Sequence, residues 1–198
     1  MGFGNLLISE TFKYLVTFKV TKMKKNEILN LFFNEPSRHW HFTEITKKAG
    51  ISKQQANKWL KRFLKERLIE HEKPKGKMPY FQANFSHPNY KIKKRLFALD
   101  QLYQSGLLAY LESIKKAKTV IIFGSFARSD WYTDSDIDVF IYGAPEKLET
   151  AKYWKKLHRP VQLHVFKNKK QIKEIHSGLI SNMINGYLVK GDIKEVLA

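Results

Sequence analysis

A glycine and a serine stand at the end of a strongly apolar run, where a phosphate group can be bound. Residues 118–123 predict a buried strand, and Gly124 and Ser125 follow it at the expected start of a short helix. Glycine lets the backbone approach a ligand closely. The free amides of a helix start favour an anion. This pattern predicts that Gly124 and Ser125 hold a triphosphate.

Two aspartates then follow in an arrangement that suits a divalent cation. Residues 136–142 predict a second strand, and residues two apart on a strand point to the same face. Asp136 and Asp138 should therefore converge, while Ile137 faces the other way. Two hard oxygen ligands beside a phosphate site suit Mg²⁺, or Mn²⁺ in its place. We therefore expect both aspartates to be metal ligands and catalytic residues.

Residues 124–140, GSFARSDWYTDSDIDVF, resemble the DNA polymerase β-like nucleotidyltransferase superfamily, specifically the minimal nucleotidyltransferases. The glycine, the serine, the intervening length and the Asp-x-Asp pair all correspond. The resemblance covers roughly residues 105–166 and implies a mixed sheet flanked by helices, which uses a nucleoside triphosphate and Mg²⁺ to transfer a nucleotidyl group. By position it implies that Gly124 and Ser125 hold the β- and γ-phosphates. It also implies metal binding by Asp136 and Asp138, and a nucleotide contact from Arg128.

Two positions depart from the pattern of that family. Ser129 replaces the glycine that often follows the arginine, which matters little. More important, the strand predicted at residues 161–166 carries Gln162 where the resemblance implies a third carboxylate. That acid would act as a ligand and as a base toward the acceptor hydroxyl, and glutamine cannot do so. Loss of a positioned base typically costs ~10²–10⁴-fold in rate.

Other side chains near this position leave two functions open. His164 shares a strand face with Gln162 and is either a substitute base or a hydrogen-bonded core residue. Asp130 and Asp134 either supply a carboxylate or shape the turn between the two halves of the motif. The first function is a Mg²⁺-dependent nucleotidyltransferase with an unknown acceptor. The alternative is a DNA-binding transcriptional regulator whose nucleotidyltransferase-like domain senses nucleotide and has weak activity or none.

The residues before this motif predict a separate module. A helix from residue 26 stops before Pro36, a short second helix closes at Gly50, and Ser52 caps a third helix that runs to about Leu68. Strands at residues 68–71 and 79–83 follow, joined by a loop with three lysines. This order resembles the winged helix-turn-helix superfamily, in which the third helix typically enters the major groove and the wing contacts backbone or minor groove.

The winged-helix resemblance implies a nucleic-acid partner, with double-stranded DNA as the first choice. The start of the third helix would face base edges or phosphates, and the loop lysines would contact phosphates. The residues concerned are Ser52, Lys53, Gln54, Gln55, Lys58, Lys73, Lys75 and Lys77. Residues 1–118 hold 24 Lys and Arg against 9 Asp and Glu, whereas residues 119–198 hold 12 against 9. This excess of positive charge in residues 1–118 would attract a polyanion. It could equally serve protein contacts or solubility.

Composition bounds the remaining possibilities. A chain of 198 residues with 43% hydrophobic content and a net charge of +18 is folded rather than disordered. The absence of cysteine excludes disulfides and thiolate metal sites. No apolar run approaches the roughly 20 residues of a membrane span, and no secretion signal is evident. We therefore expect a cytoplasmic protein without a membrane partner.

The sequence as a whole predicts an α+β protein in which an N-terminal winged helix-turn-helix domain precedes a small mixed-sheet nucleotidyltransferase-like domain. The expected divisions are an extension with a possible strand at 1–25, the winged helix at 26–86, a connecting helix at 87–104 and the second domain at 105–198. Residues 1–22 are either a real edge strand or an over-extended start. The apolar face of residues 88–117 either connects the domains or forms a homodimer seam. Residues 179–188 predict a closing helix.

Overall fold

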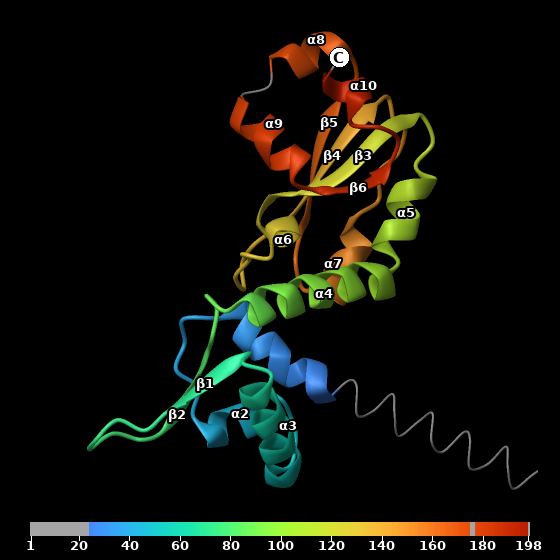
Figure 1. Cartoon of the computed structure of the whole chain (residues 1–198). Helices are drawn as coiled ribbons and strands as arrows, with labels where there is room; N and C mark the ends of the chain where they lie inside the picture. Colours follow the sequence, from blue (N-terminus) through green and yellow to red (C-terminus); the bar gives the residue numbers. More distant parts are fainter. Residues whose placement is uncertain (1–23, 175–176, 198) are drawn as a thin grey trace, which may run out of the picture. The chain divides into compact units, whose positions relative to one another are not determined.

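A computed structural model of the chain describes residues 24–174 and 177–197. The chain divides into two compact units between Tyr90 and Lys91 (Figure 1). The division falls inside α4, Pro88–Ser105, which begins in the first unit and continues in the second. The strand expected within residues 1–22 lies outside the described residues.

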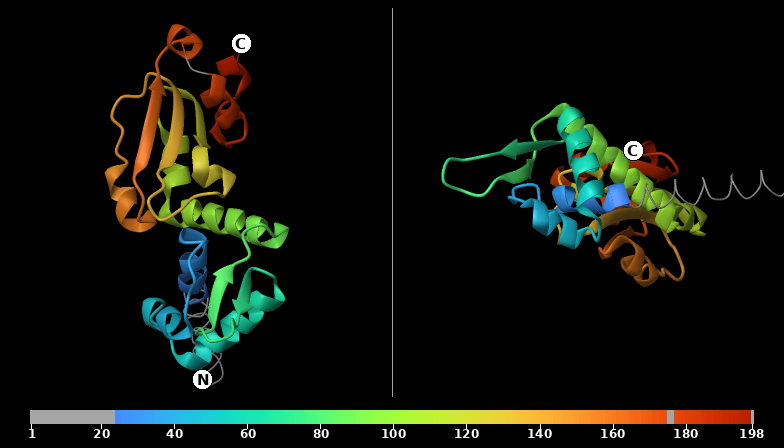
Figure 2. Two further views of the ribbon diagram at one scale, coloured as in Figure 1. Left: turned by 90° about the vertical axis from the view of Figure 1, so that its left-hand side faces the viewer. Right: turned by 90° about the horizontal axis from the view of Figure 1, so that it is seen from below.

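The first unit combines helices with a two-stranded antiparallel hairpin. Its elements are a helix over residues 24–34, α2 (Phe42–Lys48), α3 (Lys53–Lys65), β1 (Ile69–Glu72) and β2 (Tyr80–Ala83). Trp40 extends the hairpin, because its backbone exchanges two hydrogen bonds of 2.8 Å with Phe81. The loop between β1 and β2 projects away from the helices of this unit in Figure 1 and in the right-hand view of Figure 2.

Local sequence signals explain the start of α3. The Ser52 side chain accepts a hydrogen bond from the Gln55 backbone amide, and the Gln55 side chain accepts one from the Ser52 amide, each at 3.2 Å. This capping box satisfies two amides that a helix start otherwise leaves without partners. Gly50 has a φ of +57° and ends α2 in the left-handed conformation that glycine favours. The predicted turn between the two helices is therefore confirmed, although α3 ends at Lys65 rather than near Leu68.

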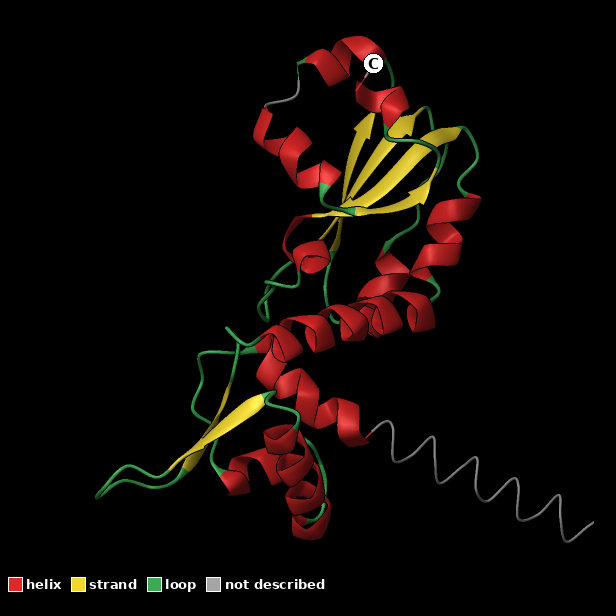
Figure 3. Ribbon diagram, in the orientation of Figure 1, coloured by secondary structure: helices red, strands yellow, loops and turns green. Residues whose placement is uncertain are grey.

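The second unit is built on a four-stranded mixed sheet (Figure 3). The strand order is β5-β4-β3-β6, with β4 and β5 parallel and the other neighbours antiparallel. The strands are β3 (Ala117–Phe123), β4 (Ile137–Gly143), β5 (Val161–Phe166) and β6 (Tyr187–Lys190). The helices are α5 (Leu107–Ser113), α6 (Gly124–Arg128), α7 (Ala151–Leu157), α8 (Lys169–Lys173), α9 (Ser177–Ile184) and α10 (Lys194–Leu197).

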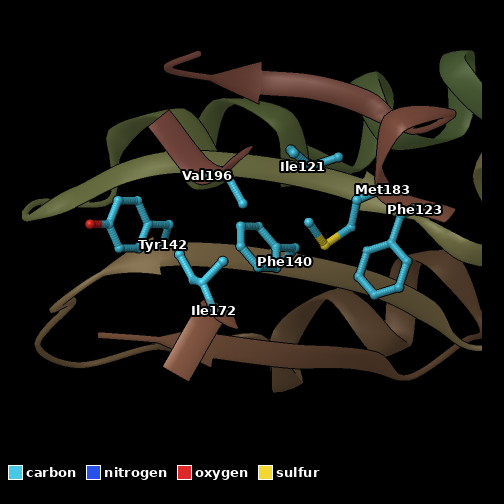
Figure 4. Packing of buried hydrophobic residues seen from close by; sticks show 7 residues of the cluster. All are labelled: Ile121, Phe123, Phe140, Tyr142, Ile172, Met183 and Val196. Carbon is cyan, nitrogen blue, oxygen red and sulfur yellow. The ribbon is translucent and has the colours of Figure 1, made fainter. Parts of the chain in front are cut away.

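Alternation along β3 and β4 gives the sheet two buried faces. One face carries Ile121, Phe123, Phe140 and Tyr142, which pack against side chains of α8, α9 and α10 (Figure 4). The alternate residues Val120, Ile122, Val139 and Ile141 point to the opposite face and are also fully buried. Because both faces are covered, these strands read as continuous apolar runs. The polar side chains of this region therefore lie at the end of β3, at the start of β4 and in the loop between them.

The prediction of one closing helix over residues 179–188 is wrong in its second half. The chain leaves α9 after Ile184 and returns as β6, which pairs with β3 at Ile121 and Ile122. A Cβ at Gly186 would lie 2.5 Å from the Ile122 carbonyl oxygen, so the turn into β6 needs glycine at this point.

Candidate active site

The turn after β3 brings the backbone against an acidic side chain. Gly124 is buried, has a φ of +76° and starts α6 directly after Phe123. A Cβ added at Gly124 would lie 3.0 Å from Asp138 Cγ and would overlap Asp138 Oδ2. Only glycine allows this approach in this backbone conformation. The short helix predicted through Arg128 is confirmed, and its first residue touches the Asp138 carboxylate.

Asp138 is held from both sides by the sheet. It lies opposite Phe123 on β3 and beside Gln162 on β5. Its side chain keeps 23% of its surface exposed, and its Oδ1 lies 3.2 Å from His164 Nε2. The carboxylate is therefore rigidly placed yet still open to solvent at the edge of the Gly124 turn.

Asp136 lies outside the strand that was expected to carry it. β4 begins at Ile137, so Asp136 is the last residue of the loop that follows α6. The Ile137 amide donates to the Pro160 carbonyl at 2.9 Å, which ties this end of the loop to the start of β5. The position of Asp136 therefore depends on the loop as well as on the sheet.

The structure puts Gln162 and His164 next to Asp138, in different environments. Gln162 is exposed and pairs with Asp138 in the parallel register of β4 and β5. His164 is half-buried, with its ring centroid 5.2 Å from that of Phe123 and its Nε2 against Asp138. Within the described residues, no three His, Asp or Glu side chains gather closely enough to form a metal cage. Asp136 and Asp138 stay the predicted ligands, and two carboxylates would suit Mg²⁺ if substrate phosphates completed the shell.

Arg128, expected near the nucleotide, is engaged by neighbours of its own unit. Its Nε donates to Asp130 at 3.0 Å and its Nη1 donates to Asn182 on α9 at 2.8 Å. The backbone amide of Asp130 also donates to the Ser125 carbonyl at 3.1 Å. These bonds brace α6, and they support the interpretation that Asp130 shapes the turn.

Two buried basic side chains that sequence reasoning missed hold the loop between α6 and β4. Arg159 is 4% exposed, and its Nη1 donates to carbonyls of Tyr132 and Ser135 at 2.6 and 2.9 Å. Lys94, on α4, is 2% exposed and donates its Nζ to the Trp131 carbonyl at 2.7 Å. Nothing in the local sequence marks them, because Lys94 stands in a run of basic residues and Arg159 in a short connection before β5.

Burial of Lys94 gives the stability of the protein a pH dependence. Desolvation, with a further contribution from Arg159, lowers the pKa of Lys94 from 10.5 to about 7. Between these values the unfolded chain binds the proton and the folded chain does not, so the free energy of unfolding should rise with pH from about 7 to about 10. The rise should approach ~1.4 kcal/mol per pH unit.

Comparison with Lys94→Met isolates this effect, because other titrating groups contribute to both proteins. Denaturant unfolding at pH 6.5 and 9.5 should show wild type gaining stability relative to Lys94→Met as the pH rises. An equal difference at both pH values would contradict the expectation.

The residues expected to contact nucleic acid lie on two elements of the first unit. Lys53, Gln54 and Lys58 are exposed on α3, and the three lysines of the β1–β2 loop are exposed as well. Ser52 and Gln55 are exposed as well, and their side chains form the capping box. Exposed side chains of the same helix that the sequence reasoning did not single out are Asn57, Lys61, Arg62 and Lys65.

Comparison with known proteins identifies one part of the chain. Residues 105–186 match the family described as nucleotidyltransferase domain. The second unit is therefore similar to a nucleotidyltransferase domain over these residues, and nucleotidyl transfer is the general chemistry that the match supports. No curated protein and no solved structure matches the chain. Among the described residues, no helix is long and apolar enough to cross a bilayer.

Proposed function

We propose that the chain transfers a nucleotidyl group from a nucleoside triphosphate to an acceptor hydroxyl with the help of Mg²⁺, and that its first unit brings this activity to nucleic acid. The observation that carries the enzymatic part is the close approach of the Gly124 turn to the Asp138 carboxylate. Transfer at the α-phosphate requires a metal-binding carboxylate beside a phosphate-binding backbone. The closeness of the Asp138 carboxylate and the Gly124 turn supports assigning these two roles to them.

The residues divide the work in the following way. The turn at Gly124 and Ser125 binds the β- and γ-phosphates with its backbone amides and the serine hydroxyl. Asp136 and Asp138 would hold Mg²⁺, and the bound ion would neutralise charge that develops on the phosphate oxygens. His164 orients the Asp138 carboxylate through the contact at 3.2 Å. Arg128 stabilises α6 through Asp130 and Asn182, and its contact with the nucleotide stays a prediction.

A second candidate function rests on Gln162. It stands beside Asp138 in the β4–β5 register and its amide cannot accept the proton of an acceptor hydroxyl. A domain that binds nucleotide without transferring it would suit a DNA-binding regulator that senses nucleotide.

One experiment separates the two functions. The full chain is incubated with labelled nucleoside triphosphates, Mg²⁺ and protein or RNA acceptors, and nucleotide binding is measured on the same preparation. We expect label on an acceptor, with release of pyrophosphate. Binding without transfer to any acceptor would reject the enzyme and favour the nucleotide sensor.

For the first unit we propose a winged helix-turn-helix that binds double-stranded DNA. The basic surface of α3 supports this, since the helix contains five Lys and Arg and no Asp or Glu. Lys53, Lys58, Lys61 and Lys65 are all exposed on it. The exposed β1–β2 loop adds three lysines, which would contact phosphates as a wing does.

The wing lysines should contribute to affinity through charge. Changing Lys73, Lys75 and Lys77 to Ala should weaken DNA binding and reduce the dependence of log K on log salt concentration by up to ~2.7, at ~0.9 for each phosphate contact. Fluorescence anisotropy between 50 and 200 mM salt measures both effects. The control carries the same change of charge at Lys167, Lys169 and Lys170, which are exposed in the second unit. Equal losses in both triple variants, or binding that ignores salt, would contradict the proposal.

A further inference from the structure

The loop that delivers Asp136 is organised around one guanidinium group. Arg159 Nη1 donates to the carbonyl oxygens of Tyr132, Thr133 and Ser135, at 2.6, 3.3 and 2.9 Å. The guanidinium carbon lies 5.6 Å from the centroid of the Phe126 ring, which belongs to α6. Arg159 therefore touches both ends of the segment that joins the Gly124 turn to β4.

An irregular loop needs donors of this kind. Its carbonyl oxygens lie outside helices and strands and must find other partners, and the Tyr132 carbonyl also accepts the Ser135 amide at 3.2 Å. Arg159 is 4% exposed, so its charge is withdrawn from water and is balanced by the carbonyl dipoles it gathers. Lys94 adds a donor to the carbonyl of Trp131, immediately before the gathered residues. Arg159 and Lys94 thus donate to the backbone of the same loop.

The bonds of Arg159 end one residue before Asp136. Ser135 is held by Arg159, and Ile137 is held by Pro160, the neighbour of Arg159 in sequence. The residues on both sides of Asp136 are therefore hydrogen-bonded to Arg159 or Pro160. Asp138 differs, because pairing with β3 and β5 holds it directly. Release of Arg159 should move Asp136 and leave Asp138 in place.

Local backbone geometry puts Arg159 where this role needs it. α7 ends at Leu157, and the next residue, His158, adopts a φ of +52° and donates its amide to the Trp154 carbonyl at 2.7 Å. This left-handed residue turns the chain sharply, and Arg159 and Pro160 then run alongside the loop before β5 begins at Val161. A non-glycine residue with positive φ is strained by itself, and the surrounding contacts must compensate for it.

From these contacts we propose that Arg159 is a positioning residue for the nucleotidyl-transfer site: it orders the loop of residues 132–135 and thereby holds Asp136 as the second metal ligand. The inference rests on the proposed function, since it assigns Asp136 to the metal. Arg159 itself does not contact the substrate.

A double-mutant cycle tests the inference. Arg159→Met and Asp136→Asn are made singly and together, and the Mn²⁺ concentration that half-saturates nucleotide binding is measured for each. Arg159→Met should raise that concentration about 10- to 100-fold, the usual effect of losing a group that orients a metal ligand. In the Asp136→Asn background the same change should add less than about twofold, because the affected ligand is already absent. Arg159→Lys keeps one donor and should fall between wild type and Arg159→Met.

Controls separate positioning from general damage. Lys155→Met removes an exposed charge from α7 and should leave the Mn²⁺ requirement unchanged. Nucleotide binding in EDTA and the midpoint of thermal unfolding are recorded for every variant. Losses of metal affinity that multiply in the double variant, or an equal loss of binding in EDTA, would overturn the role of Arg159 while leaving the proposed function intact. A wild-type protein whose nucleotide binding ignores metal would instead reject the proposed function, and this role with it.

Discussion

Replacing Asp138 by asparagine is expected to reduce nucleotidyl transfer by roughly 10²–10³-fold or more, the loss typical of removing one preorganised electrostatic group. Asparagine has nearly the same shape, so it can keep the strand pairing with Phe123 and Gln162 and retain a hydrogen bond to His164. It removes the negative charge that faces the Gly124 turn. Metal-dependent nucleotide binding should fall with the transfer rate, while the thermal midpoint changes little.

Transfer of labelled nucleotide and Mn²⁺-dependent binding measure the effect of Asp138→Asn. Glu112→Gln makes the same chemical change at an exposed position of α5 and should leave both quantities unaltered. Asp136→Asn should also suppress transfer. If the Asp138→Asn protein binds nucleotide with unchanged metal dependence, the assignment of Asp138 as a metal ligand is wrong.

Gly124→Ala is expected to have an effect of similar size through a different cause. The added methyl group would overlap Asp138 Oδ2 and lie 3.0 Å from Asp138 Cγ, so either the turn or the carboxylate must move. The φ of +76° adds a backbone penalty of about 1–2 kcal/mol for any residue with a Cβ. Nucleotide binding should fall at least tenfold, and the free energy of unfolding should fall as well.

A matched glycine distinguishes the two costs of Gly124→Ala. Gly106 lies in the same unit, has a φ of +81°, and has no neighbour within 4 Å of a built Cβ. Gly106→Ala should therefore lose stability through backbone strain alone and should bind nucleotide normally. Isothermal titration and thermal unfolding of both variants provide the comparison. Equal effects on nucleotide binding would show that contact with Asp138 is irrelevant.

Short-range signals predicted the elements that local chemistry controls. The capping residue Ser52 and the left-handed Gly50 define the turn between α2 and α3, and both act within a few residues. The strand at residues 161–166 and the helix that starts at Gly124 also follow the local pattern. The strand β6 was missed, because it has only four residues and is specified by pairing with β3, more than 60 positions earlier.

The sequence by itself determined which groups are available for chemistry: a glycine and a serine after an apolar strand, two aspartates at the next strand, and a glutamine where a third acid was expected. Tertiary structure decided which side chains these groups contact. The parallel pairing of β4 with β5 brings His164 to Asp138, and the connection before β5 brings Arg159 to the loop of Asp136. Spacing could not reveal these contacts, because they join segments separated by 24 or more residues whose approach depends on packing of the whole sheet.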